Sequence, residues 1–88
     1  MKSRASSRFW ELYSQLPAHV QRLARKNYRL WQDNPQHPSL AFKELRGGNG
    51  RFSVRVGDHY RALGRRAGDG IEWVWIGSHE EFNKLMRR

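Results

Sequence analysis

The sequence predicts an α+β domain in which an N-terminal helical hairpin packs on an antiparallel β-sheet of about four strands, followed by a short C-terminal helix. Three observations predict this fold class. Apolar residues recur at helical spacing in the first third of the chain, strand-like alternation with glycine turns fills the middle, and a capping box precedes the last apolar residues. With 88 residues and no linker or repeat, residues 1–88 are expected to form a single domain.

Two helices are expected before residue 34. Ser6 and Ser7 are suitable N-caps for the first helix. Pro17 interrupts the pattern and suits the first turn of the second helix, which should end before Asn34 because that residue precedes a proline. The apolar positions of the first helix follow the i, i+3, i+4, i+7 rule: Phe9, Leu12, Tyr13 and Leu16. Two such helices joined at a proline are typical of an αα-hairpin.

The pattern after residue 38 indicates strands. Residues 40–45 are a possible strand, and residues 51–65 should form a β-hairpin around a Gly57-Asp58 turn. Residues 71–76 are the most apolar segment and should lie at the centre of the sheet. Trp73 and Trp75 are two positions apart, so they are expected to share a face, as core residues or alternatively as platforms for base stacking. Residues 2–5 are a candidate for an added edge strand.

The last helix should begin at a capping box. Ser78 is the expected N-cap and Glu81 the N3 residue that completes the box. The helix then carries Phe82, Leu85 and Met86 on one side. His79 falls in its first turn, where backbone N–H groups favour an anion.

The charge of the chain points to a polyanionic partner. The formal net charge is +9, with 17 Lys and Arg against eight Asp and Glu, and 12% of the residues are aromatic. This combination is typical of nucleic-acid binding, and a membrane surface, a ribosomal neighbour or an acidic protein partner are the alternatives. No apolar run is long enough for a membrane span, so no membrane association is expected. The absence of cysteine excludes disulfides and fits a cytoplasmic location.

No motif for a bound cofactor or metal is present, and none is expected. The sequence has no phosphate-binding P-loop, no HExxH and no GxSxG, and its acidic residues are scattered. A basic enzyme without a metal can cleave RNA through the 2′-hydroxyl of the RNA itself. That reaction requires a base, cations that stabilise the extra phosphate charge, and an acid for the leaving oxygen.

Three residues are candidates for this chemistry. His79 is expected to act as acid or base, and the alternative is a surface histidine at a helix start. Arg61 and Arg55 lie on neighbouring strands of the hairpin and are expected to hold the phosphate, because a guanidinium fork matches phosphate oxygens. Solvation of the strand face is the alternative for any single arginine.

Five further residues are expected to contact RNA around these three. Arg51 and Arg65 lie toward the other end of the hairpin, and His59 lies beside its turn, where an exposed turn residue is the alternative. Lys43 precedes the hairpin, and the aromatic ring of Phe82 can stack on a base.

Three segments resemble the RelE/ParE superfamily of toxins from bacterial type II toxin–antitoxin systems. They are residues 42–47, FKELRG; residues 53–63, SVRVGDHYRAL; and residues 73–82, WVWIGSHEEF. With the helical hairpin before them, the resemblance extends from about Arg4 to Leu85. The last two segments are similar to a translational-repressor branch of the superfamily.

The resemblance implies the site residues and the partners. Basic residues on the middle strands of RelE-like enzymes correspond to Arg55 and Arg61, and a group after the last strand corresponds to His79. Phe82 stands where such enzymes often have a tyrosine, and Ser53 occupies a position that is lysine in some of them. The expected function is therefore a metal-independent, ribosome-dependent endoribonuclease that cleaves mRNA and inhibits translation, restrained by an acidic segment of a cognate antitoxin. The alternatives are a ParE-like inhibitor of DNA gyrase and an inactive nucleic-acid-binding relative.

Overall fold

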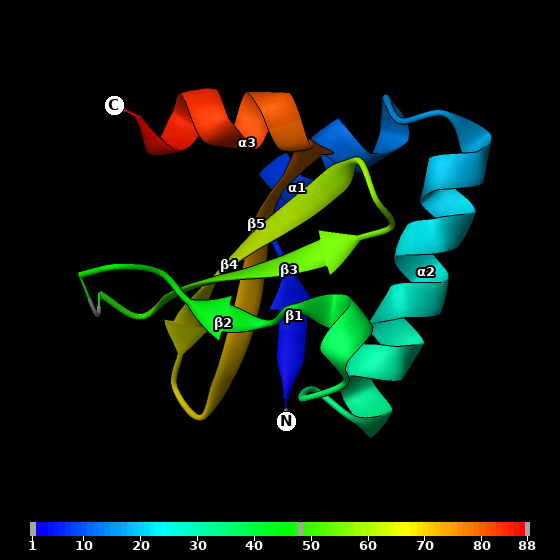
Figure 1. The fold of residues 1–88 in the computed structure, drawn as a ribbon. Helices are drawn as coiled ribbons and strands as arrows, with labels where there is room; N and C mark the ends of the chain where they lie inside the picture. The colour runs from blue at the N-terminus through cyan, green and yellow to red at the C-terminus, as the bar shows by residue number, and fades with distance from the viewer. Residues whose placement is uncertain (1, 48, 88) are drawn as a thin grey trace.

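The computed structural model describes residues 2–47 and 49–87 and has a five-stranded sheet in the order β1-β5-β4-β3-β2 (Figure 1). The strands are β1 Ser3–Ala5, β2 Lys43–Glu44, β3 Arg51–Val56, β4 Tyr60–Ala67 and β5 Gly70–Ser78. The predicted α+β class is confirmed. The candidate edge strand is present as β1, and it runs parallel to β5, so the sheet is mixed rather than wholly antiparallel.

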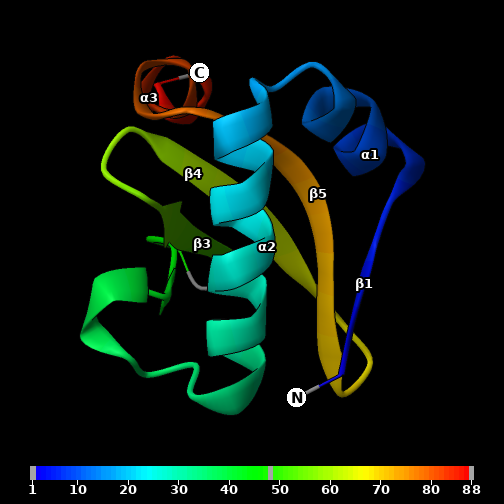
Figure 2. The ribbon, with the colours of Figure 1, turned by 90° about the vertical axis from the view of Figure 1, so that its right-hand side faces the viewer.

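Three α-helices complete the fold: α1 Ser7–Ser14, α2 Ala18–Asp33 and α3 His79–Met86. Ser6 is the N-cap of α1, and its hydroxyl oxygen accepts a hydrogen bond from the Phe9 N–H at 3.1 Å. Pro17 is the N-cap residue of α2, one position before the first turn in which the sequence predicted it. Helix α2 lies in front of the strands in Figure 2, and α1 packs on β5 beside it. None of the described helices is long and apolar enough to cross a membrane.

The predicted strand at residues 40–45 is mostly wrong. Pro38–Leu40 form a short 3-10 helix, and the strand β2 is only two residues long. Proline suits the first turn of such a helix, and Leu40 is fully buried in the core. Ala41 has a φ of 43°, a left-handed conformation that stops the chain from running on as an extended strand.

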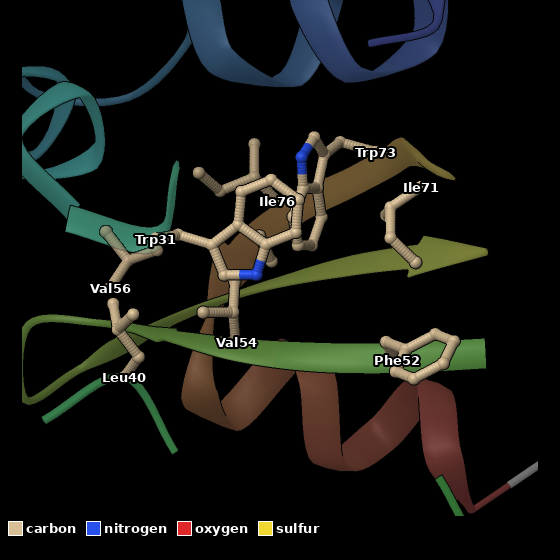
Figure 3. Close-up of a cluster of buried hydrophobic side chains, with 9 residues drawn as sticks. Trp31, Leu40, Phe52, Val54, Val56, Ile71, Trp73 and Ile76 are labelled. Atoms are coloured by element: carbon tan, nitrogen blue, oxygen red, sulfur yellow. The ribbon is translucent and has the colours of Figure 1, made fainter. Parts of the chain in front are cut away.

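The core lies between the sheet and the pair α1 and α2 (Figure 3). Trp31 of α2 is 1% exposed and meets Trp73 of β5 edge to face, with ring centroids 5.2 Å apart. The sheet contributes the alternate residues of its central strands to this cluster: Phe52, Val54, Val56, Ala62, Ile71 and Ile76. Burial of these side chains is the main source of stability. We call the side of the sheet that they occupy the core face.

A β-bulge in β5 separates the two tryptophans of that strand. Trp75 pairs with Leu63, whereas the next residue of β4, Gly64, pairs with Trp73, so Val74 is the extra residue. Trp73 therefore points to the core face and Trp75 to the opposite face. The prediction that the two rings share a face is wrong, because strict alternation holds only without a bulge. A Cβ on Gly64 would lie 2.9 Å from the Trp73 ring, so glycine is what allows this close packing.

Candidate functional site

The predicted basic residues gather on the sheet face opposite the core face. In the hairpin of β3 and β4, Arg55 lies directly across from Arg61, and Arg51 lies directly across from Arg65. Between these two rows, Ser53 pairs with Leu63 on one side and with Lys43 of β2 on the other. Cross-strand partners point to the same face. We call this surface the site face.

Helix α3 lies over one end of the site face. Figure 3 shows it on the other side of the strands from the N-terminal helices. The Phe82 ring is 7% exposed and packs on Trp75, with centroids 6.2 Å apart. Gly77 leaves room for this contact, since a Cβ there would lie 2.7 Å from the Trp75 ring.

Arg61 is held at the centre of the site. Its Nε donates a hydrogen bond to His79 Nδ1 at 3.1 Å, and one terminal nitrogen donates to Ser53 Oγ at 3.5 Å. Its guanidinium carbon lies 5.5 Å from the centre of the Phe82 ring, within reach of a cation–π contact. The structure therefore brings together the three predicted catalytic residues, with Phe82 beneath one of them.

The positive charges of Arg55 and Arg61 favour the binding of an anion. Burial, followed by the positive charge of Arg55, lowers the pKa of Arg61 below its ordinary value. Within the described part of the chain, neither Arg55 nor Arg61 forms an ion pair with a carboxylate. Two adjacent guanidinium groups without a counter-charge repel each other, and a bound phosphate would relieve that repulsion.

His79 is fixed by the capping box that the sequence predicts. The Ser78 hydroxyl oxygen accepts from the Glu81 N–H at 3.1 Å, and the Glu81 carboxylate accepts from the Ser78 N–H at 3.0 Å. The His79 N–H donates to the carbonyl oxygen of His59 at 2.8 Å. Because arginine only donates, His79 Nδ1 is the acceptor, so the neutral ring carries its proton on Nε2.

The other predicted RNA-contacting residues differ in their surroundings. His59 lies in the exposed β3–β4 turn beside the start of α3. Lys43 and Arg51 are exposed on the site face, whereas Arg65 forms two hydrogen bonds with Glu72 Oε1, at 2.7 and 2.9 Å. Phe82 is buried beneath Arg61, which leaves little of its ring accessible for stacking.

Sequence reasoning missed two residues of the site face. Glu72 lies opposite Arg65, and Arg4 of β1 lies beside Glu72 in the parallel pair. Two signals pointed toward them. Gly64 inside a strand indicates a bulge, and the candidate edge strand at residues 2–5 carries Arg4. The partner and direction of that strand could not be read from its few residues.

Comparison with known protein families identifies the class to which this fold belongs. A family model described as the ParE-like toxin domain matches residues 18–84, so the chain belongs to that family, within the RelE/ParE superfamily of toxin–antitoxin toxins. No curated protein matches the chain.

Solved structures of toxins have the same fold. The RelB-RelE antitoxin-toxin complex from Methanococcus jannaschii contains a chain with a TM-score of 0.72 and 17% identity, covering 92% of this chain and 95% of that chain. The YoeB/ParE toxin from Agrobacterium tumefaciens gives 0.68 and 21%, covering 90% and 99%. The isolated E. coli RelE toxin gives 0.65 and 14%, covering 98% and 95%. At these identities the similarity establishes the fold alone.

Proposed function

We propose that this toxin is an endoribonuclease that cleaves messenger RNA on the ribosome and thereby inhibits translation. The observation that carries the proposal is the contact between Arg61 and His79 beside an uncompensated Arg55. Two cations that can bind a phosphate and an imidazole that can exchange a proton are thus adjacent on one face. These are the parts that cleavage by the RNA's own 2′-hydroxyl requires.

In the proposed reaction, the 2′-oxygen attacks the neighbouring phosphorus as its proton passes to a base. The bond from phosphorus to the 5′-oxygen of the next nucleotide then breaks, and that oxygen takes a proton from an acid, so the products are a 2′,3′-cyclic phosphate and a 5′-hydroxyl. His79 is one of these two proton-transfer groups and water is the other. Arg55 and Arg61 stabilise the additional negative charge on the phosphate, since both are permanent cations. No metal takes part in these steps.

His79 is the proposed proton-transfer group, as acid or base. While Arg61 donates to Nδ1, the Nε2–H is the ring's remaining hydrogen-bonding group and faces the substrate as a donor; to accept a proton, Nδ1 must first release Arg61. Protonation of the ring would place a second cation against Arg61. The negative charge of a bound phosphate would reduce that repulsion.

The proposed restraint on this activity is an antitoxin with an acidic segment. The M. jannaschii relative was solved as an antitoxin–toxin complex, and the present chain has a net charge of +9 with an exposed basic face. An acidic segment across the site face would neutralise that charge and block RNA. Co-expression with the neighbouring open reading frame should restore growth; continued toxicity would count against this partner.

Primer extension on a defined mRNA in a cell-free translation reaction tests the activity. We expect cuts within codons, only on translating ribosomes, and undiminished by a chelator that leaves the ribosomes intact. His79→Ala should remove the cuts, while His19→Ala, a change to an exposed histidine at the start of α2, should leave them. Intact message at full translation would refute the proposal.

Inhibition of DNA gyrase is the second candidate, because the matching family model is described as ParE-like. This activity requires no proton transfer, so it should survive His79→Ala. A plasmid supercoiling assay distinguishes the two: gyrase activity unaffected by the protein supports the ribonuclease, and loss of supercoiling with mRNA intact supports the alternative.

A further inference from the structure

We propose that Glu72 positions Arg65 and Arg4 as a second phosphate subsite for single-stranded RNA, separate from the subsite of Arg55 and Arg61. The inference rests on the proposed function, since it concerns the same substrate on the same face. It assigns a role to two residues, Glu72 and Arg4, that the reaction itself does not use.

The contacts of Glu72 set the arrangement. Its Oε1 accepts two hydrogen bonds from Arg65, at 2.9 Å from Nε and 2.7 Å from a terminal nitrogen. Its Oε2 lies 3.5 Å from Arg4 Nε. The Glu72 side chain is only 12% exposed, while those of Arg65 and Arg4 are 63% and 73% exposed. The carboxylate therefore lies beneath two guanidinium groups that remain open to solvent.

Sheet register extends this cluster into a row across four strands. Arg51 lies opposite Arg65, Arg65 lies opposite Glu72, and Arg4 lies beside Glu72. The row thus holds three arginines and one carboxylate, of which Arg65 and Arg4 contact Glu72, so it keeps excess positive charge after the internal pairing. An ion pair that served only to join two strands would need a single arginine.

The distance between the two subsites suits a polymer rather than a single anion. Arg51 and Arg55 are four residues apart on β3, which corresponds to about 13 Å along a strand. Side chains that stand perpendicular to the sheet at this spacing match two phosphates of one strand better than a single phosphate. Between the two rows, Trp75 is partly exposed on the site face and packs on Phe82, whereas Leu63 and Ser53 are buried. An RNA strand that follows β3 and β4 would place phosphates at both rows.

Substitution of Glu72 distinguishes an effect of net charge on RNA binding from an effect of the orientation of Arg65 and Arg4, because the two predict opposite changes in affinity. Glu72→Gln makes the protein more positive by one unit, so charge alone would strengthen RNA binding. If Glu72 orients Arg65 and Arg4, the same change should weaken binding, because two flexible side chains lose their common anchor. The matched control is Glu11→Gln, the same charge change on α1, where Glu11 contacts Arg8.

The test measures fluorescence anisotropy of non-cleavable 2′-O-methyl RNA, so it needs neither ribosome nor cleavage. The probes are a dinucleotide and an oligonucleotide of about eight nucleotides, within the usual range for single-strand grooves. For Glu72→Gln we expect binding of the longer probe to fall between about three- and tenfold, with no loss of dinucleotide binding, whereas Glu11→Gln should bind the longer probe as tightly as the wild type or slightly more tightly. If the variants show these binding affinities but the protein does not cleave mRNA, the proposed activity is refuted and the proposed subsite is not.

Arg4→Gln supplies a second test at an exposed side chain whose loss does not threaten the fold. It should reduce the slope of log affinity against log salt by about 0.7 for the longer probe. The proposal would be overturned if Glu72→Gln bound the longer probe as tightly as the wild type or more tightly. It would also be overturned if Glu72→Gln lost as much affinity for the dinucleotide, or for duplex DNA, as for the longer probe. Thermal unfolding of each variant checks that the sheet is retained.

Discussion

The two faces of the sheet are built from the same strands but use opposite physical principles. In β3, Phe52, Val54 and Val56 are buried on the core face, whereas Arg51 and Arg55 are exposed on the site face. The three apolar side chains stabilise the fold through their burial. On the second face, arginines oppose arginines across the hairpin. One period-two pattern therefore specifies both the stability of this protein and its capacity to bind anions.

The difference shows where stability and function conflict. Each residue added to the core face lowers the free energy of the folded state by burial. The pairing of Arg55 with Arg61 does the reverse, since burial and like charge both disfavour the charged form of Arg61. The site is therefore expected to be complete only with a bound anion. Substitutions on the two faces should separate these effects.

The largest expected difference is between the two tryptophans of β5. Trp73→Ala removes a ring that is 6% exposed and contacts Trp31, and should lower the free energy of unfolding by about 3–5 kcal/mol. Trp75→Ala removes a less buried ring on the site face and should cost less stability while impairing cleavage, because Phe82 and Arg61 lose their support. Urea unfolding and the translation assay measure the two effects. Equal destabilisation with unimpaired cleavage by Trp75→Ala would contradict the division of roles.

Arg61→Gln should impair cleavage without lowering the stability of the fold, the converse of Trp73→Ala. Removing a group that stabilises developing phosphate charge is expected to lower the cleavage rate about 100- to 1,000-fold. Stability should be maintained or should rise slightly, since a desolvated cation opposite Arg55 is removed. The control is Arg29→Gln, the same loss of charge on an exposed residue of α2. Comparable losses of cleavage in both variants would mean that net charge, rather than this position, matters.

Two glycines allow a finer comparison of the faces. A Cβ on Gly64 would lie 2.7 Å from Ile71 Cγ2 on the core face, and a Cβ on Gly77 would lie 2.7 Å from the Trp75 ring on the site face. Each alanine variant should lose about 1–3 kcal/mol through overpacking. Only Gly77→Ala should also reduce cleavage in conditions where both variants are folded. Loss of cleavage by Gly64→Ala under those conditions would show that the faces are coupled.

Local patterns in the sequence predicted the fold class, both helices of the hairpin, the 51–65 β-hairpin and the capping box. They also placed Arg55 and Arg61 on neighbouring strands of that hairpin, and the structure shows that the two are direct cross-strand partners. The bulge at Val74 was not predictable from alternation, and without it Trp75 would belong to the core. The clustering of Arg4 with Glu72 depends on a parallel pairing between distant segments, which no local pattern contains.

The smallest predicted effect concerns the capping box that holds His79 at the edge of the site face. A hydrogen bond from the Ser78 backbone N–H, then one from its hydroxyl, lowers the pKa of Glu81 below its ordinary value of 4.5. A carboxylate whose pKa is lower in the folded state stabilises the fold above its unfolded pKa. That contribution is lost as the pH falls through the folded pKa.

Glu81→Gln tests the direction of this pH dependence of stability, because glutamine can complete a capping box without titrating. At neutral pH the variant should be within about 1 kcal/mol of the wild type. On acidification below pH 4.5, the wild type should lose more stability than the variant, so that urea midpoints converge. Parallel curves would show that the carboxylate has the same pKa in both states. Because this box is on the site face, its loss should change cleavage through the position of His79 and leave the core face intact.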